Sequence, residues 1–318
     1  MNSIEICAGG GGQALGLEQA GFEHIDLVEY EAAACTTLRL NRPQWRVVEG
    51  DVRQYTAMHI KGIDLVAGGV PCPPFSHAGK QLGADDERDM FPEAIRLVEE
   101  SQPTAVMLEN VRGLLDPKFA EYRANVIATL HKLGYEADWK LLQASDFGVP
   151  QLRPRSILVG LKRSVARHFS WPEPGLIKAT MVGDVLYDLM AADGWKGAKL
   201  WRTKAQAIGP TLVGGSKKHG GPDLGPTRAK KAWEALSVDG HGLADAPPEK
   251  SFVGMPKLTV RMAARIQGFP DSWQIAGKKT SAYRQVGNAF PPPVAKAVGE
   301  RIAAAINAAA SKKVRKKD

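Results

Sequence analysis

Cysteines, histidines and long apolar runs are scarce in this sequence. Three cysteines among 318 residues, none in a C-x-x-C pair, argue against a disulfide framework and a zinc cluster. The seven histidines form no metal-ligand spacing, and we interpret none as catalytic. No apolar run approaches the roughly 20 residues that a membrane helix needs, and the N-terminal residues lack a signal-peptide pattern. We therefore expect a soluble, cytoplasmic protein without a metal.

The overall composition is that of a globular protein with a basic excess. Hydrophobic residues make up 44% and charged residues 24% of the chain, so a packed core is expected. The length suits one large domain and a smaller one, at roughly 100–200 residues per domain. The net charge is +8, and half of this excess lies in residues 312–318. A basic chain fits a polyanionic partner, although charge alone indicates neither fold nor specificity.

The hydrophobic pattern of the first half alternates between strands and helices. It predicts strands at residues 4–7, 24–29, 46–51, 64–69, 105–110 and 156–160. It predicts helices at residues 13–20, 31–41 and 91–100. Such alternation is typical of βαβ units and a mostly parallel α/β sheet.

The composition changes at about residue 168. From there to about residue 256 the chain is rich in Gly, Pro, Lys and Trp and has few periodic segments, which indicates a second, smaller domain built on loops. Helices are predicted again at residues 258–267 and 293–310. We expect a first domain formed by residues 1–167 and 275–318, which the family resemblance described below makes the catalytic and cofactor-binding domain, and a second domain formed by residues 168–274.

A run of glycines, Gly9, Gly10, Gly11 and Gly12, separates the first predicted strand from the first helix. Glycines at this position allow a tight turn and a close approach to a ligand at the helix N-terminus. Glu29, near the end of the next strand, is placed to bind ribose hydroxyls, and Asp51 after the third strand to bind an adenine amine. The run predicts nucleoside binding, with a turn that binds nothing as the open alternative.

Three further motifs follow predicted strands. Cys72 lies between prolines on a stiff loop at the carboxyl edge of the sheet, where ligands bind in open α/β folds. Glu109 and Asn110 end the strand at 105–110, so that a nucleophile and an acid could lie together. Gln151, Arg153 and Arg155 alternate and would point the same way if extended, which suits an anionic or carbonyl-bearing ligand. A structural turn, a solvent-facing Glu and a solvated basic strand are the respective alternatives.

The order of these motifs, closed by the turn Gln285-Val286-Gly287-Asn288-Ala289, resembles that of the DNA (cytosine-5) methyltransferases along nearly the whole chain. The resemblance implies a Rossmann-like sheet that binds S-adenosylmethionine, and a target-recognition domain whose variable region spans about 168–257. Three departures concern Cys7 in place of a Phe, Pro73 after the cysteine in place of a Gln, and Met262 in place of a frequent Glu. None of the three removes a catalytic group.

The resemblance also implies roles for individual residues. Cys72 would add to C6 of cytosine, Glu109 would bind N3 and the 4-amino group, and Arg153, supported by Arg155, would hold O2. Contacts to S-adenosylmethionine are expected from Cys7, Gly9, Gly10, Gly11, Gly12, Glu29, Tyr30, Asp51, Val52, Pro71, Met90, Asn288 and Ala289. Contacts to DNA are expected from Ser76, Arg88, Lys217, Lys218, Arg228, Lys230 and Lys231.

We therefore predict an enzyme that methylates C5 of a flipped-out cytosine in a specific duplex sequence. We expect a monomeric modification enzyme of a restriction-modification system, associated with the nucleoid, with a cognate endonuclease acting separately. The alternatives are a tRNA cytosine-5 methyltransferase and a non-catalytic DNA-binding relative. A nicotinamide dehydrogenase would account for the glycine run but not for the cysteine loop.

Overall fold

The computed structural model describes residues 1–71, 89–214 and 223–314 of the chain. Its internal contacts divide the chain into two compact units. The first unit comprises Met1–Leu142, Pro154–Glu173 and Val294–Asp318, and the second comprises Gln143–Arg153 and Pro174–Pro293. The boundaries differ from the predicted domains at three places, because residues 143–153 and 275–293 group with the second unit and residues 168–173 group with the first.

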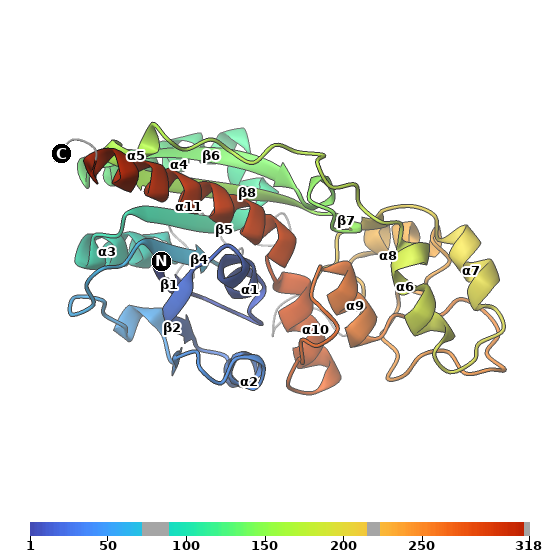
Figure 1. Cartoon of the computed structure of the whole chain (residues 1–318). Helices are drawn as coiled ribbons and strands as arrows, with labels where there is room; N and C mark the ends of the chain where they lie inside the picture. The colour runs from blue at the N-terminus through green and yellow to red at the C-terminus, as the bar shows by residue number, and fades with distance from the viewer. Residues whose placement is uncertain (72–88, 215–222, 315–318) are drawn as a thin grey trace. The chain divides into compact units, whose positions relative to one another are not determined.

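The first unit follows an alternating order of strands and helices (Figure 1). Its strands are β1 (Asn2–Ile6), β2 (Glu23–Glu29), β3 (Val47–Glu49), β4 (Leu65–Gly69), β5 (Ala105–Val111), β6 (Tyr135–Gln143) and β8 (Pro154–Lys162). Its helices are α1 (Gly12–Gln19), α2 (Ala32–Asn41), α3 (Phe91–Ser101), α4 (Ala120–Lys132), α5 (Arg163–Ala166) and α11 (Pro292–Val314), with short 3-10 turns η1 (Val52–Gln54), η3 (Arg112–Leu115) and η4 (Pro117–Phe119). The predicted α/β class is confirmed, and strand β6 and helix α4 are additions to the predicted elements.

The sheet of the first unit has seven strands in the order β3-β2-β1-β4-β5-β8-β6. Strands β1 to β5 pair in parallel, whereas β8 pairs antiparallel to β5, with Glu109 opposite Ile157. The strand order reverses direction at β1, which lies between β2 and β4. In open α/β sheets ligands bind outside the carboxyl ends of the strands at such a reversal. This topology therefore marks the loops after β1, β2 and β4 as the place for a site.

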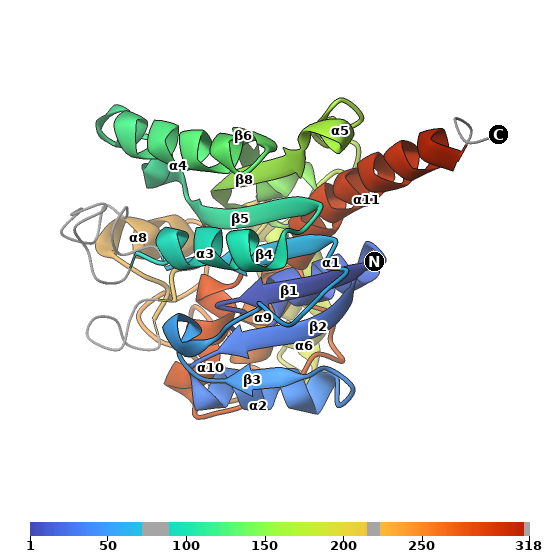
Figure 2. The same cartoon turned by 90° about the vertical axis from the view of Figure 1, so that its left-hand side faces the viewer.

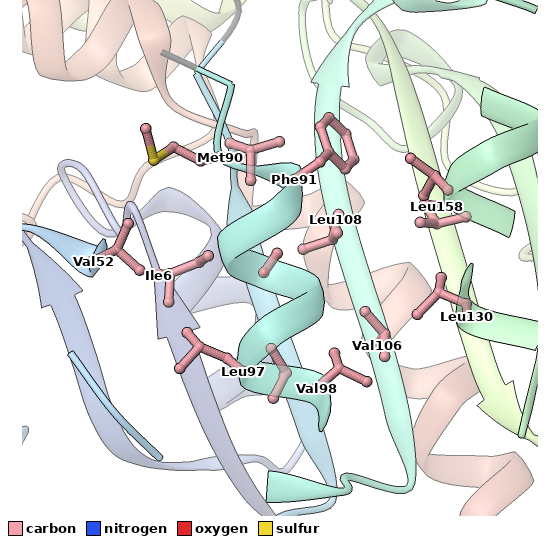
Figure 3. Packing of buried hydrophobic residues seen from close by; sticks show 14 of the residues in the cluster. Ile6, Val52, Met90, Phe91, Leu97, Val98, Val106, Leu108, Leu130 and Leu158 are labelled. Atoms are coloured by element: carbon pink, nitrogen blue, oxygen red, sulfur yellow. The ribbon is translucent and has the colours of Figure 1, made fainter. Parts of the chain in front are cut away.

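Helices cover both faces of this sheet. Ile6 and Val106 of the strands pack against Leu97 and Val98 of α3 on one face (Figure 3), and α4 adds Leu130 to the same cluster. Figure 2 shows α3 and α4 in front of the strands. On the other face the Ser3 hydroxyl hydrogen-bonds to His24 Nδ1, and His24 Nε2 hydrogen-bonds to the carbonyl of Ala14 in α1. Because Ser3 and Ile4 alternate along β1, the two faces of the sheet meet different helices, which fixes the register of the strand.

The second unit contains more helix than its composition predicts. Its elements are η5 (Ala144–Asp146), β7 (Gln151–Leu152), α6 (Val182–Ala191), α7 (Ala198–Lys204), β9 (Gly209–Pro210), α8 (Thr227–Glu234), α9 (Val260–Ile266) and α10 (Lys279–Asn288). Strands β7 and β9 form a two-stranded parallel sheet. Residues 168–256, expected to form an irregular domain built on loops, contain the helices α6, α7 and α8, and buried side chains such as Leu186 and Trp201 give α6 and α7 an apolar face. The turn expected at residues 285–288 is likewise the end of α10.

Candidate active site

The loop between β1 and α1 adopts a left-handed backbone at three positions. Cys7, Gly9 and Gly11 have φ values of 52°, 54° and 83°, and Gly11 is the residue before α1. The glycines adopt these angles without a Cβ penalty, and they leave the N-terminal N–H groups of the helix facing the carboxyl end of the sheet. Burial and the nearby Glu29 carboxylate raise the pKa of the Cys7 thiol, which therefore stays protonated at neutral pH. The loop is suited to hold a nucleoside, and Cys7 is unsuited to act as a nucleophile.

Glu29 at the end of β2 is tied to this loop. Its Oε2 accepts a hydrogen bond from the backbone N–H of Gly9 at 2.7 Å, and its Oε1 accepts one from Glu31 at 2.8 Å. Burial raises the pKa of Glu29, and these backbone donors partly offset the effect. The neighbouring Tyr30 is 65% exposed. Two backbone donors thus orient a buried carboxylate beside the glycine turn, as a contact to ribose hydroxyls requires.

Asp51 lies two residues beyond β3. Its carboxylate accepts the backbone N–H of Arg53 at 2.9 Å and pairs with the Arg53 guanidinium at 2.7 Å. The Arg53 side chain, through its hydrogen bonds, lowers the pKa of Asp51. Asp51 is therefore an anion at neutral pH, next to the buried Val52 that begins η1. It remains accessible, with 37% of its side chain exposed.

A buried ion pair between β5 and β8 lies close to the last residues of β4. The Arg155 Nε lies 2.7 Å from Glu109 Oε1, with 11% and 5% of the two side chains exposed. A Cβ placed on Gly69 would lie 3.5 Å from Glu109 Oε2, and Asn110 donates to the carbonyl of Val70 at 3.3 Å. Glu109 therefore lies against the last residues before the loop. Cys72 itself is outside the described residues, which end at Pro71 on this side.

Arg153 and Arg155 occupy different surroundings. Arg153 is fully buried in the second unit, where its guanidinium donates to the carbonyls of Leu212, Gly287 and Ala289. Arg155 belongs to β8 of the first unit and pairs with Glu109. The segment from Gln151 to Arg155 is not one extended strand, because β7 ends at Leu152 and β8 begins at Pro154. The structure thus brings only the second of the two arginines together with the acid.

The remaining predicted cofactor residues lie at helix ends. Met90 precedes α3 and is buried, while Asp89 fixes the start of that helix by accepting the Phe91 N–H at 3.0 Å. Asn288 is the last residue of α10 in the second unit, and Ala289 follows it.

The predicted DNA contacts are described only in part. Ser76, Arg88, Lys217 and Lys218 lie outside the described residues. Helix α8 exposes Arg228 and Lys231. Lys230 is less exposed and pairs with Asp223 at 2.8 Å. Of the three α8 cations, Arg228 and Lys231 are thus the better placed for a phosphate.

Sequence reasoning gave no role to two buried polar features. Glu5 in β1 is fully buried, and burial raises its pKa well above the ordinary range. The only signal for it was a carboxylate alternating with Ile4 and Ile6 in a buried strand. Gln151 and Gln267 form a buried side-chain hydrogen bond at 2.6 Å, which no spacing predicts because 116 residues separate them.

Among the described residues, no group of His, Cys, Asp and Glu side chains is arranged to hold a metal ion. No described helix is long and apolar enough to cross a membrane.

The glycine turn and its acidic partner Glu29 lie at the point where the strand order of the parallel sheet reverses, and the buried acid Glu109 lies at the end of β5. This combination defines a nucleoside-binding α/β enzyme of the methyltransferase class. The sequence profile of the C-5 cytosine-specific DNA methylases matches residues 1–304. The chain belongs to this family, as predicted, and is a DNA cytosine-5 methyltransferase. The family uses S-adenosylmethionine and acts on DNA.

The chain is 56% identical over 315 residues to the Type II methyltransferase M.NgoMIV of Neisseria gonorrhoeae, covering 96% of this chain and 98% of that protein. It is 59% identical to the Type II methyltransferase M.NaeI of Lentzea aerocolonigenes, covering 96% and 76%. A solved structure of an E. coli prophage protein, assigned as a DNA modification methyltransferase, matches with a TM-score of 0.67 and 26% identity, covering 96% and 99%. DNMT2 of Spodoptera frugiperda shares the fold, with a TM-score of 0.65, 17% identity and coverage of 95% and 99%.

Proposed function

We propose that this chain is the modification enzyme of a restriction-modification system, which methylates C5 of a flipped-out cytosine within a specific duplex sequence. It acts as a monomer in the nucleoid, and a separate endonuclease recognises the same sequence. The observation that carries the chemistry is the buried Glu109–Arg155 pair, which lies against Gly69 three residues before Cys72. Similarity to two Type II methyltransferases at 56% and 59% identity supports the biological role.

Cys72 and Glu109 divide the activation of the base. Cytosine C5 is a poor nucleophile, so the Cys72 thiolate adds to C6 and turns the ring into an enamine with electron density at C5. Glu109 holds a proton at N3, which prevents negative charge from building up on the ring. Bound S-adenosylmethionine supplies the methyl group that C5 accepts. A base then takes the C5 proton, and the electron pair of the C5–H bond re-forms the C5–C6 double bond as the C6–S bond breaks and the thiolate leaves.

We propose that Arg155, in place of Arg153, supports the base at O2. Arg155 is positioned by Glu109 at 2.7 Å, so the two side chains present a donor and an acid along one edge of a pyrimidine. Arg153 instead directs its guanidinium to three backbone carbonyls of the second unit. Our expectation that Arg153 faces the ring is therefore replaced by a structural role.

The described residues at the strand ends of the first unit are suited to hold the cofactor. The turn at Gly9–Gly12 would admit the nucleoside, the Glu29 carboxylate would accept hydrogen bonds from the ribose hydroxyls, and the Asp51 carboxylate would accept one from the adenine amine. Cys7, Tyr30, Val52 and Pro71 follow the ends of β1, β2, β3 and β4 in sequence, and Met90 precedes α3. Asn288 and Ala289 at the end of α10 complete the set. The Glu29 carboxylate, which the backbone N–H groups of Gly9 and Glu31 orient, is the structural feature that supports binding of such a ligand.

The second unit reads the DNA. Arg228 and Lys231 of α8 contact phosphates, with Lys230, Lys217 and Lys218 nearby in sequence, and Ser76 and Arg88 contribute from the segment after Cys72. Phosphate contacts fix the register of the protein on the duplex but carry no sequence information. Flipping the target base costs a few kcal/mol, which these contacts offset.

Three assays test this function. Expression in a host free of 5-methylcytosine, followed by sequencing of 5-methylcytosine, should reveal one modified sequence. Labelled S-adenosylmethionine should methylate duplex DNA and leave tRNA unmodified. A duplex with 5-fluorocytosine at the mapped position should trap the wild-type chain covalently, and Cys72→Ala should not be trapped. Host DNA that stays unmodified beside folded, cofactor-loaded protein would contradict the proposal.

A further inference from the structure

A buried polar network in the second unit connects the segment at Leu212 to the end of α10. The Arg153 Nη1 donates to the carbonyl of Leu212 at 2.8 Å. Its Nη2 donates to the carbonyls of Gly287 at 2.8 Å and Ala289 at 3.0 Å. One side chain, 0% exposed, thus bridges two backbone segments that are about 75 residues apart in sequence.

Two glutamines complete the same network. Gln151 Oε1 accepts the backbone N–H of Leu212 at 2.8 Å, so both backbone groups of Leu212 are bound by side chains of one segment. Gln151 Nε2 donates to Gln267 Oε1 at 2.6 Å, and Gln267 Nε2 donates in turn to the carbonyl of Ala289 at 2.5 Å. All three side chains are fully buried. Such buried hydrogen-bond networks hold their members in one arrangement.

Two glycines bring the backbones into direct contact beside this network. A Cβ on Gly287 would lie 2.4 Å from the N and 2.5 Å from the Cα of Gly214. A Cβ on Gly214 would lie 2.6 Å from Asn288 Oδ1. No side chain separates the two segments here, so a displacement of one must displace the other.

Each of these segments leads to a different proposed ligand. Val213, the neighbour of Gly214, packs against the start of α8, since a Cβ on Gly225 would lie 3.2 Å from the Val213 Cβ, and α8 exposes the proposed DNA contacts Arg228 and Lys231. Asn288 and Ala289 are proposed cofactor contacts. We infer that Arg153 and the Gly214–Gly287 contact are positioning elements that couple DNA binding to cofactor binding within the second unit. This inference rests on the proposed function, and it assigns Arg153 no contact with the base.

Coupling has a thermodynamic signature that a merely structural role lacks. If DNA raises the affinity for the cofactor, the cofactor raises the affinity for DNA by the same factor, which is typically about 5–150-fold. The probes are S-adenosylhomocysteine and a duplex that carries the mapped target sequence. The measured quantity is the Kd of S-adenosylhomocysteine without the duplex divided by its Kd at saturating duplex.

We expect this ratio to exceed about five in the wild-type chain. It should fall to below about two in Gly287→Ala, where the added methyl collides with the backbone of Gly214, while each ligand alone still binds. Arg153→Met should lower the ratio in the same way, and Arg153→Lys, which keeps a cation with three donors, should restore part of it.

Gly183→Ala is the matched control. Its Cβ would lie 2.4 Å from the carbonyl oxygen of Arg202, a backbone clash of the same severity in the same unit. It should lower thermal stability and leave the ratio unchanged. A wild-type ratio near one, or an unchanged ratio in Gly287→Ala, overturns the coupling even if the wild-type chain methylates DNA. A wild-type chain that leaves DNA unmethylated overturns the proposed function itself.

Discussion

Glu109 and Arg155 are the residues on which the chemistry depends most directly. Glu109→Gln keeps the size of the side chain but lowers its acidity, so N3 receives no proton from it, and Arg155 loses its buried counter-ion. We expect methyl transfer in a single turnover to slow by at least about 100-fold, the usual contribution of a positioned acid. Thermal stability should also fall, since a buried charge is left without its partner.

Glu99→Gln is the control for this change, because Glu99 is exposed on α3. It should leave both rate and stability unaltered. A Glu109→Gln rate within about threefold of wild type, well below the usual effect of a general acid, would remove Glu109 from the mechanism.

Glu5 gives a prediction about pH. Burial raises its pKa well above the ordinary carboxyl range, with a further contribution from the charge of Glu29. Below the ordinary pKa the carboxyl is neutral in both the folded and the unfolded chain, and it has no adverse effect. As pH rises, the unfolded chain ionises first, so folding stability is lost until the raised pKa is passed.

Glu5→Gln should therefore stabilise the chain increasingly with pH. We expect its free energy of unfolding in urea, relative to wild type, to grow by about 1.4 kcal/mol per pH unit above the ordinary pKa and then to level off. A flat difference for Glu5→Gln would mean that its carboxyl ionises as readily folded as unfolded.

The limits of sequence reasoning at this scale are visible in the two arginines. Alternation in an extended strand predicted that Arg153 and Arg155 point the same way. The break between β7 and β8 at Arg153 separates them. Glu109, which pairs with Arg155, and Leu212, which accepts from Arg153, are 46 and 59 residues away in sequence, beyond the reach of a local pattern. Glu29 and Glu109 were found because each ends a strand, and position at a strand end is a local property.

Strand β4 is the element that connects the sheet to the proposed site, and its last two glycines face opposite ways. A Cβ on Gly68 would lie 2.7 Å from Ile6 Cγ1, between β1 and β4, whereas one on Gly69 would lie beside Glu109. We expect Gly68→Ala to lower the free energy of unfolding in urea by about 1–3 kcal/mol, as overpacking does.

Gly69→Ala should affect the reaction and leave the stability of the chain almost unchanged. Its methyl group would lie at an ordinary contact distance, 3.5 Å from Glu109 Oε2, so stability should change little. The rate of methyl transfer should fall, because the methyl group occupies space beside the acid. Equal stability losses in the two variants would show that β4 does not distinguish a core face from a site face.

At the scale of elements, the sequence predicted the strands and helices whose apolar residues recur at a regular spacing. The parallel strands and α3 follow from apolar alternation and helical spacing. Helices α6 and α7 were missed because Gly, Pro and Trp interrupt their surroundings, and helix formation there depends on tertiary burial of Leu186 and Trp201. The end of α10 was taken for a turn because Gly287 and Asn288 are poor helix formers.

The division of the whole molecule into two units could not be read from the chain, because it depends on contacts between distant segments. Residues 143–153 and 275–293 join the second unit through hydrogen bonds such as Gln151 to Gln267. Composition located only the broad change near residue 168. The functional separation into a unit for the cofactor and a unit for DNA is a proposal that binding experiments on the complete chain can test.

The net charge of +8 predicts DNA binding that weakens with salt, and α8 allows the contribution of single cations to be separated. Each phosphate contact adds about 0.9 to the slope of log K against log salt concentration. Arg228→Ala should reduce this slope by about one, measured with a duplex lacking the target sequence over roughly 50–200 mM KCl. Lys230→Ala should reduce it less, because Asp223 at 2.8 Å already neutralises that ammonium group. If the two slopes fall equally, the Lys230–Asp223 pair opens when DNA binds, and both cations contact phosphate.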